Sequence, residues 1–440
     1  MGSCMIRRLS LSACLPLLSL LSAASAQAAL PEAAAPRATV ARLEALNASD
    51  SFKTAAARLD ADWDRIVADI ITLTEIPAPP FGEAKRASAF ADMLKAHGLE
   101  DVEIDEEGNA MGLRRGTGKP GGPLLVVAAH LDTVFPAGTD VKVRREGDRL
   151  LAPGIGDDTC SLSVLLAFIR AMDAAGIRTT QDILFVGNVG EEGPGDLRGI
   201  RHLFSKGRYK DRVAQFVAFE PGRDGITIGG IGSRRYKVAF KGPGGHSNGD
   251  FGMVNPAYAM ANAITRFSQM PVPKEPRTVF NVGIVEGGTS VNSIPFETAI
   301  TVDMRSEGKA ALDEQENYLL GLLQPAVDTE NAARSTVKGK ISYEAKKVGD
   351  RPVGLTPANS PIVQIATASA LAAGTKPVYR IGSTDSNIPM SLGIPAITLG
   401  SGFSTSRSHS LEESLLLDRP GTVKHMTVGL ATVIALAGGK

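Results

Sequence analysis

Cysteine is scarce in this chain: only three of its 440 residues are cysteine, and two of them, Cys4 and Cys14, lie close to the N-terminus. If that end is removed, Cys160 remains alone and no disulfide can form within the chain. Net charge is absent as well, because 47 basic residues balance 47 acidic ones. This balance argues against a basic surface for nucleic acid and against a solvated acidic tail.

Residues 1–28 have the pattern of an export signal. A pair of arginines precedes an apolar run over 9–21, and Ala26 and Ala28 offer cleavage sites after small residues. The run is too short and too rich in serine to span a membrane stably. The arginine pair leaves both the general secretory route and the twin-arginine route open. We expect an exported protein, periplasmic or secreted.

The stretch 124–132 predicts the centre of the fold. Its apolar run, bounded by glycine and proline, ends in His130 and Asp132 and is typical of a strand buried on both faces of a sheet. In open α/β sheets, ligands bind beyond the carboxyl ends of such strands. His130 and Asp132 are two residues apart, so they face the same side. The imidazole is suited to bind a metal ion while the carboxylate holds its other N–H.

Further acids, and one histidine, follow other predicted strands or a glycine-rich turn. In chain order these residues are Asp157, Asp158, Glu191, Glu192, Glu220 and His409. The carboxyl ends of parallel strands meet at one edge of a sheet, so several of these acids should lie close together there. Crowded carboxylates repel one another and lose solvation unless a cation joins them. The pattern therefore predicts divalent metal ions at this edge.

The chain is long enough for more than one domain. Residues 29–230 alternate strand and helix patterns that resume over 350–440, which predicts an α/β domain with a mostly parallel central sheet. Between these parts, 231–349 has the order βαββαβ, the ferredoxin-like pattern, and is predicted to form an inserted domain. Residues 29–50, rich in alanine and proline, are expected to form a loose leader.

In combination, the motifs resemble the co-catalytic zinc metallopeptidases and aminoacylases. That family includes glutamate carboxypeptidase G, succinyl-diaminopimelate desuccinylase, peptidase T and carnosinase. The likeness covers nearly all of the chain after the signal and includes a lid loop, Gly-Gly-His246-Ser, in the inserted domain. It implies a zinc-peptidase-type catalytic domain and a lid domain through which two copies form a homodimer.

The resemblance also implies a ligand set for two divalent ions, Zn²⁺ or alternatively Co²⁺ or Mn²⁺. The implied metal ligands are His130, Asp157, Glu192, Glu220 and His409. His130 and Glu220 would bind one ion, and Glu192 and His409 the other. Asp157 would bridge them, although Asp158 stays an alternative because Thr159 replaces a lysine that is common in the family.

The resemblance implies four further roles in the reaction and in substrate binding. Glu191 would be the general base for a water shared by the metals. Asp132 would orient His130, and His246 would reach across the dimer to stabilise an oxyanion. Asn292 and Arg305 would hold a carboxylate or carbonyl group of the substrate.

The expected activity is hydrolysis of an amide bond in a small peptide or an N-acyl amino acid. Glutamate at position 220 goes with the carboxypeptidases and aminoacylases among the relatives, so that type is favoured. Two alternatives stay open: a di- or tripeptidase of the aminopeptidase type, and a non-catalytic binding module with a vestigial metal site. Neither substrate preference nor the native metal follows from the sequence.

Overall fold

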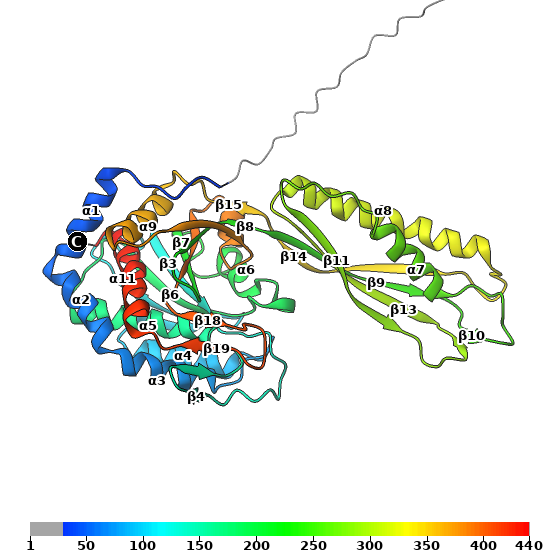
Figure 1. Ribbon diagram of the computed structural model, residues 1–440, viewed down its shortest axis with the longest axis horizontal. Helices are drawn as coiled ribbons and strands as arrows, with labels where there is room; N and C mark the ends of the chain where they lie inside the picture. The colour runs from blue at the N-terminus through cyan, green and yellow to red at the C-terminus, as the bar shows by residue number, and fades with distance from the viewer. Residues whose placement is uncertain (1–29, 440) are drawn as a thin grey trace, which may run out of the picture.

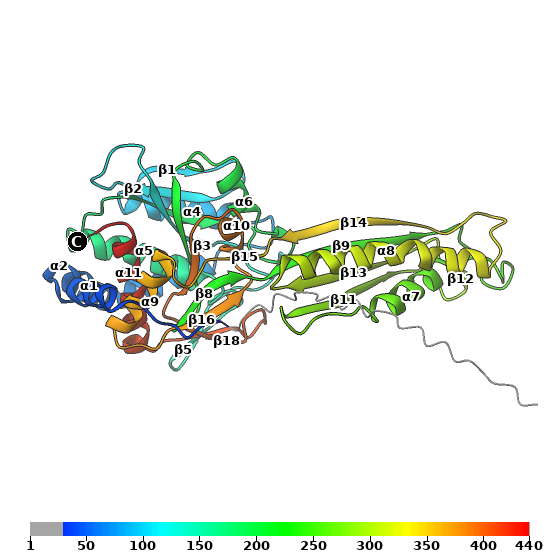
Figure 2. The ribbon, with the colours of Figure 1, turned by 90° about the horizontal axis from the view of Figure 1, so that it is seen from above.

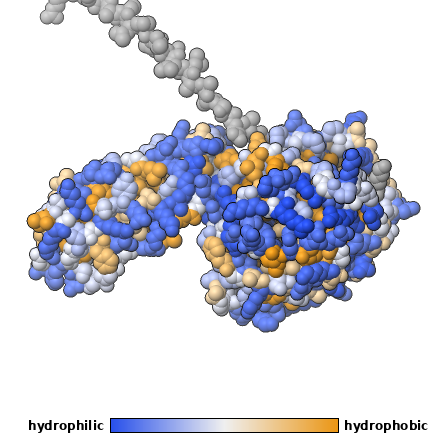
Figure 3. All heavy atoms as spheres, turned by 180° about the vertical axis from the view of Figure 1, so that it is seen from behind, coloured by the Kyte–Doolittle hydropathy of each residue, from blue (hydrophilic) through white to orange (hydrophobic). Residues whose placement is uncertain are grey.

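The computed structural model describes residues 30–439, so the predicted export signal lies outside the described residues. Two units follow one another along the long axis of the molecule: a larger α/β unit, and an elongated unit made of one sheet and two helices (Figure 1). The space-filling view shows them as two lobes with a notch between them (Figure 3). In the part of the chain that is described, no helix is long and apolar enough to cross a bilayer.

The larger unit is built on a nine-stranded sheet with the order β1-β2-β6-β3-β7-β17-β8-β15, in which β16 also pairs with β8. The central strands β6, β3, β7 and β17 are parallel, and antiparallel pairs lie toward the edges. The predicted sheet is therefore confirmed. The strands are β1 (Glu100–Ile104), β2 (Ala110–Arg114), β3 (Leu124–His130), β6 (Asp182–Asn188), β7 (Val213–Glu220), β8 (Gly225–Gly230), β15 (Gly354–Leu355), β16 (Val378–Gly382) and β17 (Ala396–Gly400).

Strand β3 is buried along its whole length, as its apolar run predicts. Side chains of a strand alternate between the two faces of its sheet. Leu125 and Val127 pack into the core on one face, whereas Leu124 and Val126 pack into the core on the other. Strand β3 also lies in the middle of the sheet, between β6 and β7, and this position carries His130 into the interior.

Helices cover both faces of this sheet. Residues of α1, α2, α3, α4, α5, α9 and α11 share one core, and those of α6 and α10 share the core on the opposite face. The helices are α1 (Arg37–Ala48), α2 (Asp50–Ala61), α3 (Trp63–Thr74), α4 (Ala84–Ala96), α5 (Thr159–Ala174), α6 (Arg198–Ser205), α9 (Pro361–Ala372), α10 (Asn387–Ser391) and α11 (Arg419–Leu436).

The loose leader expected over 29–50 is wrong for most of its length, because α1 occupies 37–48. Alanine and leucine favour helix, and the fully buried Leu43 anchors α1 in the core, where the helix packs on α9. The proline-rich composition applies only to the residues before it. Ser49 caps the N-terminus of the next helix, because its hydroxyl accepts a hydrogen bond from the Phe52 N–H in the first turn of α2.

The elongated unit has a four-stranded antiparallel sheet with the order β11-β13-β9-β14 and a core of its own. In Figure 2, α8 runs along this sheet, and the shorter α7 lies beside the part of it that is far from the larger unit. The βαββαβ order and this strand order are those of a ferredoxin-like fold. Its elements are β9 (Gly232–Lys241), β10 (Gly245–His246), α7 (Pro256–Phe267), β11 (Thr278–Gly287), β12 (Ser293–Ile294), β13 (Glu297–Ser306), α8 (Lys309–Ala333) and β14 (Ser342–Arg351).

A small antiparallel sheet of the larger unit brings two distant loops together. Its order is β18-β19-β5-β4. The elements are β4 (Arg144–Glu146), β5 (Arg149–Leu151), β18 (Ser404–Ser406) and β19 (Ser414–Leu416). Because β5 pairs with β19, the glycine-rich turn that follows β5 lies beside the loop between β18 and β19. These loops carry Asp157 and His409.

The packing of α5 on α3 gives a first prediction. The guanidinium of Arg170 is buried and donates from Nε to Asp62 Oδ2 (2.7 Å) and from Nη1 to Asp69 Oδ2 (2.9 Å). Replacing Arg170 with methionine leaves two buried carboxylates without this partner, and we expect a loss of about 3–5 kcal/mol in the free energy of unfolding. Denaturation in urea or by heat measures this loss.

Arg65 supplies the matched control. It also contacts Asp69, at 3.0 Å, but its side chain is 58% exposed. A pair whose basic partner is open to solvent contributes little, and Asp69 keeps Arg170 after the change, so Arg65→Met should have little effect. Equal losses in the two variants would contradict the argument from burial.

Candidate metal centre

The predicted cluster lies at the carboxyl edge of the parallel strands. Strand β3 ends at His130, and the neighbouring β7 ends at Glu220. On the other side of β3, Asn188 of β6 pairs in register with His130, and Glu191 and Glu192 follow just beyond it. Parallel neighbours therefore deliver a histidine and three carboxylates to one point of the sheet edge.

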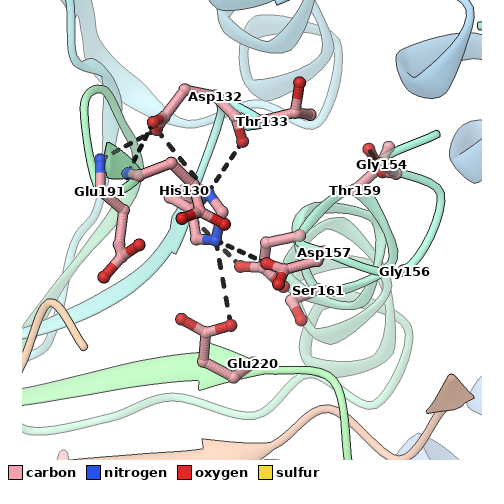
Figure 4. A network of polar contacts seen from close by, with 12 residues as sticks. His130, Asp132, Thr133, Gly154, Gly156, Asp157, Thr159, Ser161, Glu191 and Glu220 are labelled. Atoms are coloured by element: carbon pink, nitrogen blue, oxygen red, sulfur yellow. Dashed lines mark hydrogen bonds and ion pairs between the residues drawn. The ribbon is translucent and has the colours of Figure 1, made fainter. Parts of the chain in front are cut away.

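His130, Asp157 and Glu220 form the first half of the cluster. His130 Nε2 lies 3.0 Å from Asp157 Oδ1 and 3.9 Å from Glu220 Oε2. Figure 4 shows these three side chains pointing toward one another, with Glu191 across from them. They come from β3, from the turn before α5 and from β7, so distant parts of the chain meet here.

His409 and Glu192 form the second half. His409 Nε2 lies 2.8 Å from Glu192 Oε1 and 3.3 Å from Asp157 Oδ2. Asp157 thus presents one oxygen to each histidine. Asp158 presents none to His409: its Oδ2 accepts a hydrogen bond from the backbone N–H of His130, and its buried Oδ1 has no partner in the described part of the chain.

The protonation equilibria show how crowded the negative charges are. Burial raises the pKa of Glu220 well above its ordinary value, and repulsion from Asp158 adds to this shift. Burial likewise raises the pKa of Glu191 to about 8, although the Arg351 guanidinium opposes the rise. Hydrogen bonds to Asp157 and Glu192 raise the pKa of His409 to about 10. Each shift is one that added positive charge would relieve.

The donor atoms fit two divalent cations. Two donors on one tetrahedral zinc lie roughly 3.3 Å apart, given zinc–nitrogen and zinc–oxygen bonds of about 2.0–2.2 Å. The four contacts of the two halves span 2.8–3.9 Å. Imidazole nitrogen and carboxylate oxygen suit zinc, and they also suit manganese or cobalt.

The carboxylate of Asp132 has a different contact from the one expected. His130 Nδ1 lies 2.9 Å from the backbone carbonyl oxygen of Asp132 but 3.7 Å from its carboxylate. That carboxylate instead accepts hydrogen bonds from the backbone N–H groups of Glu191 (3.0 Å) and Glu192 (2.8 Å). Asp132 therefore orients His130 through its main chain and holds the neighbouring loop through its side chain.

Glu413 was not among the predicted site residues, yet it holds the loop of Asp157. Its buried carboxylate accepts from the backbone N–H groups of Gly154 (3.1 Å), Gly156 (2.8 Å) and Asp157 (2.8 Å). The spacing of Glu413 four residues after His409 was visible in the sequence. What it contacts depends on the pairing of β5 with β19, which the sequence pattern did not reveal.

A cavity of about 520 Å³ opens beside the cluster. It is lined by His130, Val134, Asp157, Glu191, Glu192, Gly193, Glu220, Pro221, Arg235, Arg305, Arg351, Gly382, Ser383, Thr384 and His409. The three arginines all come from the elongated unit. Asp303 accepts from Arg235 Nε (3.1 Å) and from Arg305 Nε (2.6 Å), which aligns these two arginines at the cavity wall. Of the three, only Arg305 was predicted.

His246 and Asn292 lie together, but not in this cavity. Residue His246 of β10 pairs with Ser293 of β12, and the Ser247 N–H donates to the Asn292 carbonyl oxygen at 3.0 Å. Figure 1 places β10 at the end of the elongated unit that is farthest from the larger unit. Within one chain, therefore, the structure does not bring these two residues to the predicted metal ligands.

Comparison with protein families agrees with this geometry. The model of peptidase family M20/M25/M40 matches residues 126–437, which include all five predicted metal ligands. The chain belongs to this family. Members of the family depend on metal, in keeping with the donor set described here.

Individual proteins that are similar to this chain support its assignment to the peptidase family. Carboxypeptidase G2 from a Pseudomonas species is 26% identical over 189 residues, which are 42% of this chain and 45% of that protein. A putative [LysW]-lysine/[LysW]-ornithine hydrolase from Pyrococcus abyssi is 35% identical over 165 residues, which are 37% of this chain and 42% of that protein. The chain therefore matches less than half the length of either relative. The crystal structure of aminopeptidase PepT from Bacillus cereus superposes with a TM-score of 0.66 at 21% identity, and covers 85% of this chain and 99% of that one. Human carnosine dipeptidase 1 superposes with a TM-score of 0.68 at 12% identity, covering 88% and 99%. At these identities the two structures show a shared fold.

The contacts of Glu413 generate a second prediction. Glu413→Gln keeps the volume of the side chain but replaces one carboxylate oxygen with an amide NH2 group. That group cannot accept the hydrogen bond from a backbone N–H that the oxygen accepts. We expect the affinity for Zn²⁺ to fall by about 10- to 100-fold, as is usual when a group supporting the ligands is lost. Competition with a fluorescent zinc chelator measures this affinity without any substrate.

Its neighbour Glu412 is the matched control. Glu412 is exposed and pairs with Arg407 at the surface. Glu412→Gln should leave zinc affinity unchanged. If Glu413→Gln binds zinc as tightly as Glu412→Gln, the proposed support of the Asp157 loop is wrong.

Proposed function

We propose that this protein is a metal-dependent hydrolase that cleaves an amide bond in small peptides or N-acyl amino acids, of the carboxypeptidase or aminoacylase type. One observation carries the proposal. Asp157 presents an oxygen to each of two histidines, and the buried carboxylate of Glu191 lies beside them on a cavity with arginines in its wall. Such a pair of facing donor groups suits hydrolysis assisted by two metal ions.

In this proposal His130 and Glu220 would hold one ion and Glu192 and His409 the other, with the carboxylate of Asp157 lying between the two histidines. Two divalent cations, when bound, polarise a carbonyl group and make water more acidic. We infer zinc from the nitrogen and oxygen donors.

In the proposed reaction Glu191 transfers a proton from the attacking water to the leaving amine. Its carboxylate takes one proton from the attacking water, and the water oxygen adds to the carbon of the scissile carbonyl. Glu191 then passes the proton to the nitrogen of the leaving amine as the C–N bond breaks, giving a carboxylic acid and an amine. The acid then loses its own proton to the amine or to solvent. A carboxyl group that is buried and shielded from solvent, as Glu191 is, suits both proton steps.

The arginine wall favours a substrate with a free carboxylate. Arg305 uses Nε for Asp303, and its two terminal nitrogens have no hydrogen bond to a described residue. Those terminal groups are suited to bind a carboxylate. A free carboxylate next to the cleaved bond is what carboxypeptidase and aminoacylase substrates share. The relative named carboxypeptidase G2 points the same way.

We infer that His246 and Asn292 serve the cavity of a second copy of the chain. They share one end of the elongated unit, and a homodimer through this lid would bring that end to the partner's metal ions. His246 would then donate to the oxygen that becomes negative as water adds. We also propose export to the periplasm or the medium, on the basis of the signal pattern in 1–28.

Removing the metal tests the proposed chemistry. Chelator-treated protein should not hydrolyse N-acyl amino acids, dipeptides or tripeptides, and addition of Zn²⁺, Co²⁺ or Mn²⁺ should restore the activity.

Glu191→Gln should bind two metals per chain and lose about 10²- to 10⁴-fold in kcat, because proton transfer is lost. Elemental analysis and rate measurements on the same samples check both statements. Two bound metals without hydrolysis of any substrate would favour the binding module, and binding of no metal would refute the site.

Mixing two inactive variants tests the shared site. Glu191→Gln lacks the base, and His246→Ala lacks the lid histidine, so each homodimer should be nearly inactive. After subunit exchange, a mixed dimer has one site with an intact Glu191 and an intact His246 from the other chain. We therefore expect activity to reappear on mixing. Absence of recovery, with exchange shown by native mass spectrometry, would mean that His246 does not act across the dimer.

A further inference from the structure

The loop that carries Glu191 and Glu192 is held by the root of the elongated unit. From β9, Arg235 donates through Nη1 to the Gly193 carbonyl oxygen at 2.8 Å. From β14, the Asp350 N–H donates to the carboxylate of Asp196 at 3.0 Å. Both strands that connect the two units therefore contact the same loop. The third contact, made by Arg351, reaches the proposed general base itself.

Arg351 is the last residue of β14 and is buried. Its Nη1 donates to Glu191 Oε1 at 3.0 Å and to Ser383 Oγ at 3.0 Å, and its Nη2 donates to the backbone carbonyl oxygen of Glu191. One guanidinium thus holds both the main chain and the side chain of Glu191. The Glu191 carboxylate has no other hydrogen bond to a described residue, so its Oε2 remains available.

We propose that Arg351 is a positioning residue for Glu191, which fixes Oε1 so that Oε2 faces the water and which ties the base to the root of the lid. This inference rests on the proposed function of Glu191. A planar guanidinium with two parallel donors is suited to the task, because it fixes direction as well as distance. A single ammonium group would supply the charge but would leave the carboxylate free to turn.

The contacts of Arg351 separate this role from substrate binding. Its Nη1 and Nη2 are used within the protein, and its Nε is buried without a partner in the described chain. By contrast, the terminal nitrogens of Arg305 are free for a ligand. Loss of Arg351 should therefore lower the rate of the chemical step, whereas loss of Arg305 should weaken substrate binding.

Arg351→Met tests the inference, with Arg201→Met as its matched control. Arg201 also joins the two units, donating to the Asp350 carbonyl oxygen and to Asp196, but it does not touch Glu191. In Arg351→Met we expect kcat to fall about 100-fold, because small displacements of a reacting group have effects of this size. KM should stay within about twofold, and the metal content should stay at two ions per chain. Arg201→Met should keep its kcat within a few-fold.

Arg351→Lys restores the charge without the second donor and should recover only part of the lost rate. Hydrogen–deuterium exchange of the peptide containing Glu191 and Glu192 gives a readout that needs no substrate. Their N–H groups are protected by Asp132, and exchange should quicken in Arg351→Met but not in Arg201→Met.

Three results would overturn the inference: full recovery by lysine, a loss carried by KM, or equal effects of Arg351→Met and Arg201→Met on rate and exchange. The proposed function is judged separately. Wild-type protein that binds two metals but cleaves nothing would refute the function, while the exchange data would still decide whether Arg351 positions Glu191.

Discussion

Repulsion among buried carboxylates is the constraint on which the rest of this structure depends. Glu191, Glu192, Glu220 and Asp157 converge on one edge of the sheet, where water cannot screen them fully. Without compensation such a cluster costs several kcal/mol per uncompensated charge. The imidazoles of the site compensate part of it, as the raised pKa of His409 shows, and divalent cations would compensate the remainder. The surroundings must keep the acids in place against their own repulsion.

Three buried groups meet that need by holding the backbone of the loops that carry the acids, and one of them, Arg351, holds a carboxylate as well. The Asp132 carboxylate accepts the N–H groups of Glu191 and Glu192, and the Glu413 carboxylate accepts three N–H groups around Asp157. From the elongated unit, Arg351 donates to Glu191, whose N–H group is also bound by Asp132. Each loop that carries an acid is therefore fixed by hydrogen bonds to charged groups, which are the strongest kind available. Rigid loops are what allow like charges to remain close together.

The sequence was informative where a pattern is local. The apolar run before His130 specifies a buried strand, and strand-end acids specify the sheet edge, so the parallel sheet and its cluster of donors follow from periodicity and spacing. The contacts of Glu413 and Arg351 do not follow in this way. Each depends on a pairing between segments far apart in the chain: β5 with β19 for Glu413, and the return of β14 onto the Glu191 loop for Arg351. The carboxylate of Asp132 shows the same limit, because its position predicted a contact with His130 while the folded loop places two backbone N–H groups closer to it. Helix α1 escaped prediction because its alanines carry little amphipathic signal.

The register of the inserted sheet relates two of the arginines that line the cavity. Arg305 of β13 and Arg351 of β14 both pair with Ser233 of the strand between them, so these positions form one row across the sheet at its root. Directly opposed residues point to the same face, which accounts for both arginines reaching the same cavity. A sheet is stiff along such a row. In the proposed function Arg305 would bind the carboxylate of the substrate, and Arg351 would position Glu191. The shared row therefore fixes the distance between the group proposed to recognise the substrate and the group proposed to position the base.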